Sequence, residues 1–201
     1  MESHYLLMTT KYAILSEQQL VDCGTPEEYN LHGCSGGLPS YAFDYIRDHG
    51  ITFEKTIPYK GEEQECRYTE YDKVILTKGP FNIEALNEDQ LTESVYNQGP
   101  ISVAFQVVGD FRNYESGVYS STECKNGKQD VNHAVLAVGY GNENGKDHYI
   151  IKNSWGTEWG DEGFFKIERG VNMCGIAVCN SYPTGVSDIY SSDVEFFMKQ
   201  N

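Results

Sequence analysis

The stretches AVLAVGYG (134–141) and HYIIKNSW (148–155) decide the fold of this chain. Each is an apolar, β-branched and aromatic run bounded by Gly and Asn, which is typical of a β-strand. The short turn between them predicts an antiparallel hairpin. ISVAFQV (101–107) and GFFKIER (163–169) have the same character, so the second half of the chain is predicted to form a sheet.

Helical patterns precede these strands. Ser16 opens a capping box, S-E-Q-Q, that begins a short helix. Apolar residues at helical spacing indicate a second helix over 38–49, and a capped segment over 87–98 indicates a third. Helices first and strands second predict the α+β class, or two lobes that meet near Gly99-Pro100.

Composition excludes several classes of function. The 201 residues carry 15 basic and 30 acidic side chains, a net charge of −15, which argues against a nucleic-acid binder with a cationic groove. No apolar run is long enough to span a membrane. No C-x-x-C pair suggests a zinc site, and neither a metal nor a cofactor is expected. The dispersed cysteines suit disulfides in an oxidising compartment, or free buried thiols: Cys23, Cys34, Cys66, Cys124, Cys174 and Cys179.

One histidine has an arrangement that could carry chemistry. His133 lies where a polar loop meets a strand, and Asn153 ends the next strand along the chain. A hairpin would bring the two side by side, so that an amide oxygen fixes the imidazole tautomer and leaves the other ring nitrogen free to accept a proton. Trp155 could then cover that hydrogen bond. From spacing alone, purely structural roles for all three residues are the simpler interpretation.

Several motifs, in consistent order, resemble the papain family of cysteine proteases. They are LSEQQLVDC (15–23), GCSGG (33–37), QDVNHAVLAVGYG (129–141) and YIIKNSWGTEWGDEGFFKI (149–167). ESHYL, YSSTEC and NMCGIA are similar to the cathepsin H branch of that family. The match runs from about Glu2 to Pro183.

The resemblance implies a papain-like two-lobe fold of the α+β class. Residues 1–99 would form a helical left lobe with a truncated central helix, 100–183 an antiparallel β-barrel right lobe, and 184–201 a C-terminal tail. All three would together make one papain peptidase domain.

The same resemblance implies roles for individual residues. His133 would be the general base, Asn153 would orient it and Trp155 would shield the pair. Cys179 would tether a short propeptide remnant. The residues expected to bind a peptide or protein substrate are Gly36, Gly37, Leu38, Pro39, Ala134 and Trp155. The expected disulfides join Cys23 to Cys66 and Cys124 to Cys174.

The family's nucleophile motif, Q-x-x-C-G-S-C-W, does not occur in residues 1–201. We therefore expect an N-terminally truncated chain with no signal peptide, inactive as it stands, because His and Asn alone have no thiol to activate. It would be a fragment of a lysosomal or secreted cysteine peptidase, expected to be a monomer. The alternatives are a non-catalytic paralogue that binds peptides or inhibitors, and an unrelated α+β domain. Exopeptidase or endopeptidase preference stays open.

Overall fold

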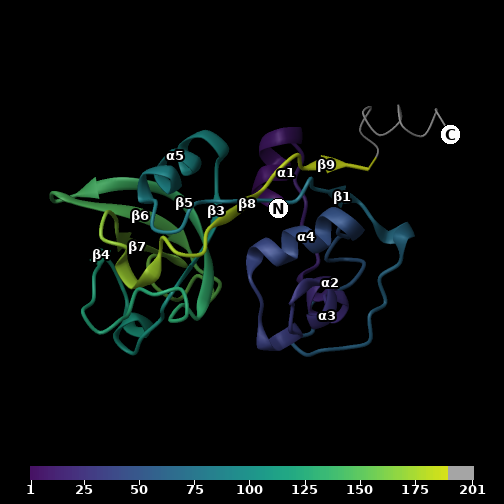
Figure 1. Cartoon of the computed structure of the whole chain (residues 1–201), viewed down its shortest axis with the longest axis horizontal. Helices are drawn as coiled ribbons and strands as arrows, with labels where there is room; N and C mark the ends of the chain where they lie inside the picture. Colours follow the sequence, from purple (N-terminus) through teal and green to yellow (C-terminus); the bar gives the residue numbers. More distant parts are fainter. Residues whose placement is uncertain (190–201) are drawn as a thin grey trace. The chain divides into compact units, whose positions relative to one another are not determined.

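A computed structural model describes residues 1–189, and the chain divides into two compact units (Figure 1). Among the described residues, the helical unit comprises 1–81 and 183–189, and the β unit comprises 82–182. Each unit has its own buried apolar core.

The helical unit is built from short helices joined by long loops. Its elements are α1 (Glu2–Thr9), α2 (Glu17–Cys23), α3 (Pro26–Tyr29), η1 (Gly33–Ser35), α4 (Pro39–His49), η2 (Glu70–Asp72), β1 (Ile75–Leu76) and β9 (Ser187–Asp188). Only half of the predicted capping box is present. Ser16 Oγ accepts a hydrogen bond from Gln19 N at 3.0 Å, but the backbone N–H of Ser16 donates to Thr52 O and not to the Gln19 side chain. Helix α4 begins at Pro39 and ends at Gly50, whose φ of 77° suits glycine. The single turns of α3 and η1 lie in a segment whose sequence reads as loop.

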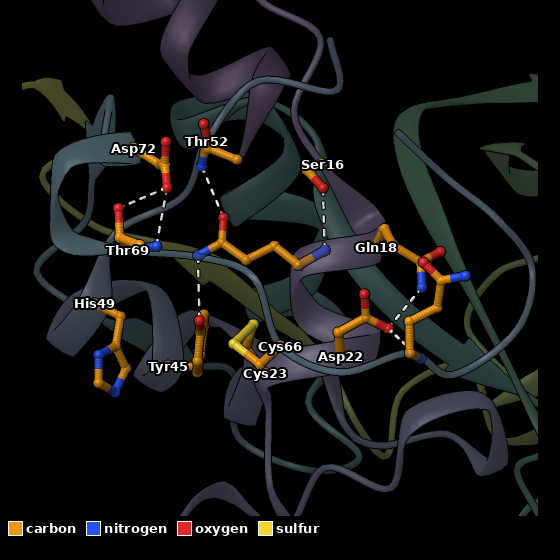
Figure 2. The surroundings of a disulfide bond; sticks show 12 residues. Ser16, Gln18, Asp22, Cys23, Tyr45, His49, Thr52, Cys66, Thr69 and Asp72 are labelled. Atoms are coloured by element: carbon orange, nitrogen blue, oxygen red, sulfur yellow. Dashed lines mark hydrogen bonds between the residues drawn. A yellow bond between two sulfur atoms is a disulfide. The ribbon is translucent and has the colours of Figure 1, made fainter. Parts of the chain in front are cut away.

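Buried polar side chains of α2 hold the neighbouring loops in place (Figure 2). Gln19 donates to Tyr45 Oη and to Gly50 O, and its amide oxygen accepts from Thr52 N at 2.8 Å. Asp22 accepts from Gln64 N at 2.9 Å, two residues before the Cys66 end of the disulfide to Cys23. The disulfide and these hydrogen bonds fix a loop that has little secondary structure of its own.

A seven-stranded sheet has the order β2-β8-β3-β5-β6-β7-β4, and it belongs to the β unit except for residues 80–81 of β2 and residue 183 of β8. Its strands are β2 (Pro80–Asn82), β3 (Ile101–Phe105), β4 (Val118–Tyr119), β5 (His133–Glu143), β6 (Lys146–Lys152), β7 (Phe164–Glu168) and β8 (Ser181–Pro183), with η3 (Asp110–Asn113) and η4 (Met173–Gly175) in the connections. The four strands predicted from sequence correspond to β3, β5, β6 and β7. They pair antiparallel, whereas β4 pairs with β7 in parallel.

The division of the chain differs from the predicted boundary at Gly99-Pro100. Helix α5 (Glu88–Gln98) belongs to the β unit, where it packs on β3 and β5 (Figure 1). The physical reason is burial, because Leu91 and Val95 lie in the same apolar core as Ile101. A local helical pattern does not reveal which core the apolar face of the helix will join.

The predicted tail over 184–201 is part of the helical unit where the structure describes it. Strand β9 pairs antiparallel with β1, with Ile75 opposite Asp188. Val186 is buried in the core of that unit. The rest of the predicted tail, from residue 190 on, lies outside the described residues.

Within residues 1–189, no helix is long and apolar enough to cross a membrane. In the same range, no group of three or more His, Cys, Asp or Glu side chains is arranged to hold a metal ion.

Candidate active site

Two neighbouring strands position His133 and Asn153. His133 is the first residue of β5 and lies opposite Phe105 of β3. Asn153 follows directly after β6, which pairs with β5, and its backbone N–H donates to Gly163 O at 2.9 Å. Backbone pairing holds each residue on one side, His133 against β3 and Asn153 against Gly163, which restricts the directions of their side chains.

A hydrogen bond of 2.8 Å joins His133 Nε2 to Asn153 Oδ1. The same amide oxygen accepts the backbone N–H of Ser154 at 2.8 Å. Because a backbone N–H can only donate, this second contact identifies the atom as the oxygen of the amide. His133 must therefore donate from Nε2. In the neutral ring this leaves a lone pair on Nδ1, so the arrangement selects one tautomer.

Aromatic rings surround this pair. The indole of Trp155 stacks on the His133 imidazole, with centroids 5.2 Å apart and 28° between the planes. Trp159 packs edge-on against Trp155 at 4.9 Å, and Phe111 does so at 5.7 Å. Asn153 is only 8% exposed, whereas His133 is half-buried, so the hydrogen bond is sheltered while the ring keeps access to solvent.

The residue before His133 has a positioning contact that the sequence alone does not predict. Asn132 Oδ1 accepts from Val107 N at 2.8 Å, and Asn132 Nδ2 donates to Val107 O at 3.2 Å. These two bonds imitate a β-ladder and continue the pairing of β3 with β5 past Phe105 and His133. The signal in the sequence is an amide side chain directly before a strand, where Asn side chains often bond to nearby backbone.

Of the residues expected to bind substrate, Ala134 and Trp155 lie beside His133 and Asn153 in the β unit. Ala134 is exposed on β5. The other four lie in the helical unit, where Gly36 and Gly37 precede Leu38 and Pro39 at the start of α4. Gly36 has a φ of 104° and open space around the position a Cβ would take, and both glycines are exposed.

Both expected disulfides are present, Cys23–Cys66 and Cys124–Cys174. Cys34 and Cys179 are free thiols. Cys34 is exposed, whereas Cys179 is half-buried. Burial raises the pKa of the Cys179 thiol, and the positive charge of Lys128 only partly offsets this effect.

The family follows from comparison with known proteins. A model described as papain family cysteine protease matches residues 1–184. The chain belongs to the papain family of cysteine proteases. Among curated members, Pro-cathepsin H of Medicago truncatula is 52% identical over 184 residues, covering 91% of this chain and 52% of that protein. Pro-cathepsin H of Bos taurus is 49% identical over 184 residues, covering 91% and 54%. The similarity to the cathepsin H branch is thereby confirmed.

Solved structures confirm the α+β papain-like fold. The structure of digestive procathepsin L 3 from the larval midgut of Tenebrio molitor matches with a TM-score of 0.84 at 36% identity, covering 91% of this chain and 59% of that chain. Procathepsin L2 from the same tissue matches with a TM-score of 0.80 at 41% identity, covering 87% and 54%. The chain spans about half the length of the curated papain-family relatives above.

Proposed function

We propose that this chain carries the base and the orienting residue of a cysteine peptidase that cleaves peptide bonds in peptide or protein substrates. The observation that carries the proposal is the hydrogen bond from His133 Nε2 to Asn153 Oδ1. It leaves Nδ1 as the ring nitrogen available to a thiol. Membership in the papain family of cysteine proteases supports the interpretation of His133 as the base that activates a thiol.

The reaction needs a proton acceptor that later becomes a proton donor. His133 Nδ1 takes the proton of a thiol, and the thiolate attacks the carbonyl carbon of the peptide bond. As the C–N bond breaks, the imidazolium returns the proton to the leaving amine. Water then hydrolyses the thioester, with the same nitrogen as general base. Asn153 accepts from Nε2 throughout and keeps the ring aligned.

We propose that the nucleophile is none of the six cysteines in residues 1–201. Four of them are joined in disulfides. Cys179 has a raised pKa, which disfavours the reactive thiolate. Within the described residues, no hydrogen bond joins the thiol of Cys34 to a basic group. Residues 1–201 alone should then not hydrolyse peptides, and a segment that carries Q-x-x-C-G-S-C-W should supply the thiol.

Two measurements test this proposal. The first reads the transcript for an in-frame Q-x-x-C-G-S-C-W ahead of Met1. The second assays a fluorogenic dipeptide with residues 1–201 alone and with a polypeptide that also includes such a segment. We expect turnover only from the second polypeptide, with sensitivity to thiol alkylation. His133→Ala should abolish turnover, whereas His32→Ala, which removes an exposed imidazole of the helical unit, should not.

Steady turnover by residues 1–201 alone, or full activity of His133→Ala, would refute the proposal. If no thiol segment exists and the chain binds peptides without turnover, the non-catalytic paralogue becomes the better interpretation.

The remaining substrate contacts belong to the same proposal. Gly36 and Gly37 would bond the substrate backbone, because exposed glycines allow a peptide to approach closely. Leu38 and Pro39 of the helical unit, and Ala134 of the β unit, would each contact a substrate side chain. Ala134→Val should then change which substrate side chains the enzyme prefers. The ratio of kcat/KM for substrates with small and with large side chains measures this change.

Membership in the family also leads us to propose a covalently bound propeptide remnant and a cellular compartment for this protein. The two disulfides suit an oxidising compartment, and the family suggests a lysosomal or extracellular location. Cys179 would form a mixed disulfide with a propeptide remnant in a monomeric enzyme. Mass spectrometry of the native protein without reductant should reveal the attached peptide, and its loss with dithiothreitol.

A further inference from the structure

An arginine lies next to the indole that stacks on the His133 imidazole. The guanidinium Cζ of Arg112 sits over the Trp155 ring, 5.8 Å from its centroid. Trp155 in turn stacks on His133 at 5.2 Å. A permanent positive charge therefore stands one aromatic ring away from the base.

The backbone around Arg112 is anchored. Arg112 belongs to η3, and its carbonyl oxygen accepts from Trp159 Nε1 at 3.0 Å. The preceding residue, Phe111, is fully buried among the aromatic rings. The backbone of Arg112 is therefore fixed, while its side chain is exposed and free to meet a ligand.

Arg112 has no carboxylate of its own. In the described part of the chain, Arg47 and Arg169 form salt bridges with aspartates, whereas no Asp or Glu lies within salt-bridge distance of Arg112. The nearby Asp110 carboxylate accepts from Tyr119 Oη at 2.9 Å. In a chain with a net charge of −15, an unpaired guanidinium beside the base is an exception to the general acidic character.

The chemistry of the reaction indicates which part of the substrate lies near the Arg112 guanidinium. The leaving amine takes its proton from His133, so the residue after the cleaved bond must come within hydrogen-bond distance of that ring. An extended residue advances about 3.4 Å along the chain. Arg112, two ring contacts away from the same imidazole, is therefore within reach of the first residues of the leaving peptide.

We propose that Arg112 binds a carboxylate on the leaving-group side of the substrate, and so favours cleavage before Glu or Asp. The planar guanidinium fits a carboxylate through two parallel N–H bonds while its face stays on the indole. This inference rests on the proposed peptidase function, because that function defines the leaving-group side.

The first test measures binding to residues 1–201 and needs no thiol. Glu-Ala-amide, Gln-Ala-amide and Lys-Ala-amide, which imitate the leaving peptide, are titrated while NMR follows the His133 ring and the Trp155 indole N–H. We expect Glu-Ala-amide to bind about two- to fivefold more tightly than Gln-Ala-amide, the range of an exposed ion pair. Arg112→Gln should remove this preference. Arg112→Glu should bind Lys-Ala-amide more tightly than Glu-Ala-amide.

The matched control is Arg67→Gln, which removes the same charge from an exposed site of the helical unit. It should keep the wild-type preference. The proposal is overturned if Arg112→Gln keeps the preference, if Arg67→Gln loses it equally, or if none of the peptides shifts the His133 and Trp155 signals.

The second test separates this inference from the peptidase function. In the polypeptide that includes a thiol segment, kcat/KM is compared for substrates with Glu or Gln after the cleaved bond. An active peptidase with equal values for both overturns the role of Arg112 and leaves the peptidase function intact. A Glu preference in binding without any turnover overturns the peptidase function instead.

Discussion

The indole ring of Trp155 stacks on the imidazole ring of His133, with centroids 5.2 Å apart and 28° between the ring planes. Trp159 and Phe111 meet this indole edge-on, so its plane is set by a packed aromatic cluster. The orientation of the imidazole thus has two independent supports. Asn153 fixes one ring nitrogen, and Trp155 fixes the plane of the ring.

Replacing Trp155 should open the His133–Asn153 hydrogen bond to water. In Trp155→Ala, we expect the Nε2 proton of His133 to exchange with solvent on the order of tenfold faster, because the ring that excludes water is gone. Exchange-sensitive ¹⁵N NMR of the imidazole on residues 1–201 measures this rate. Trp159→Phe keeps an aromatic ring in the cluster and should leave exchange near the wild-type rate. Equal rates in wild type and Trp155→Ala would contradict the shielding role.

The pair of His133 and Asn153 could be anticipated from sequence because its causes are local. Apolar alternation and Gly-rich turns mark β5 and β6, and a hairpin places the start of one strand near the end of the next. The contact seen in the structure agrees with that expectation. Its catalytic role stays a prediction until the measurements above are made.

Other features depend on long-range packing and could not be predicted in this way. The pattern of α5 marks a helix correctly but does not say that Leu91 joins the core of the β unit. The placement of Arg112 over Trp155 joins residues 43 positions apart through a 3-10 turn whose sequence has no helical signal. The family resemblance supplied the disulfide pairing, which spacing alone left open.

Asn132 should stabilise the start of β5 through its two bonds to Val107. Asn132→Ala should lower the free energy of unfolding by about 1 kcal/mol, since two solvent-exposed hydrogen bonds are lost. Urea denaturation measures this difference. His133 signals should also broaden, because the strand end becomes free to fray. Asn97→Ala removes only an exposed contact of 3.5 Å and should change stability little. An equal loss in both variants would contradict the positioning role of Asn132.

The two free cysteines should react at different rates. Cys34 is exposed, whereas Cys179 is half-buried and burial raises its pKa, so Cys179 holds less thiolate at neutral pH. Iodoacetamide at pH 7.5 should label Cys34 on the order of tenfold faster, as read by peptide mass spectrometry. Labelling of unfolded protein in urea serves as the control and should bring the two rates together. Faster labelling of Cys179 in the native chain would contradict the described environment.

Asp188 should make the helical unit sensitive to acid. Its carboxylate accepts from Tyr5 Oη and from Lys11 Nζ, both at 2.6 Å. Burial of Asp188 raises its pKa, but the bonds from Lys11 and Tyr5 outweigh burial and leave the pKa below its ordinary value. A pKa that is lower in the folded than in the unfolded state stabilises the fold above the unfolded value of about 3.9. That contribution is lost as the pH falls through the folded pKa.

Asp188→Asn should therefore be less stable than wild type at pH 7, by under about 1 kcal/mol because solvent screens the exposed Lys11 partner. The difference in stability between the two proteins should shrink as the pH falls below about 4, because the wild-type carboxylate then takes up a proton, first in the unfolded and then in the folded state. Urea denaturation of residues 1–201 at a series of pH values measures both curves. Glu65→Gln, at an exposed position outside strands β1 and β9, should follow wild type throughout. A difference between Asp188→Asn and wild type that stays constant from pH 7 to pH 3 would show that lost packing, and not charge, accounts for the effect.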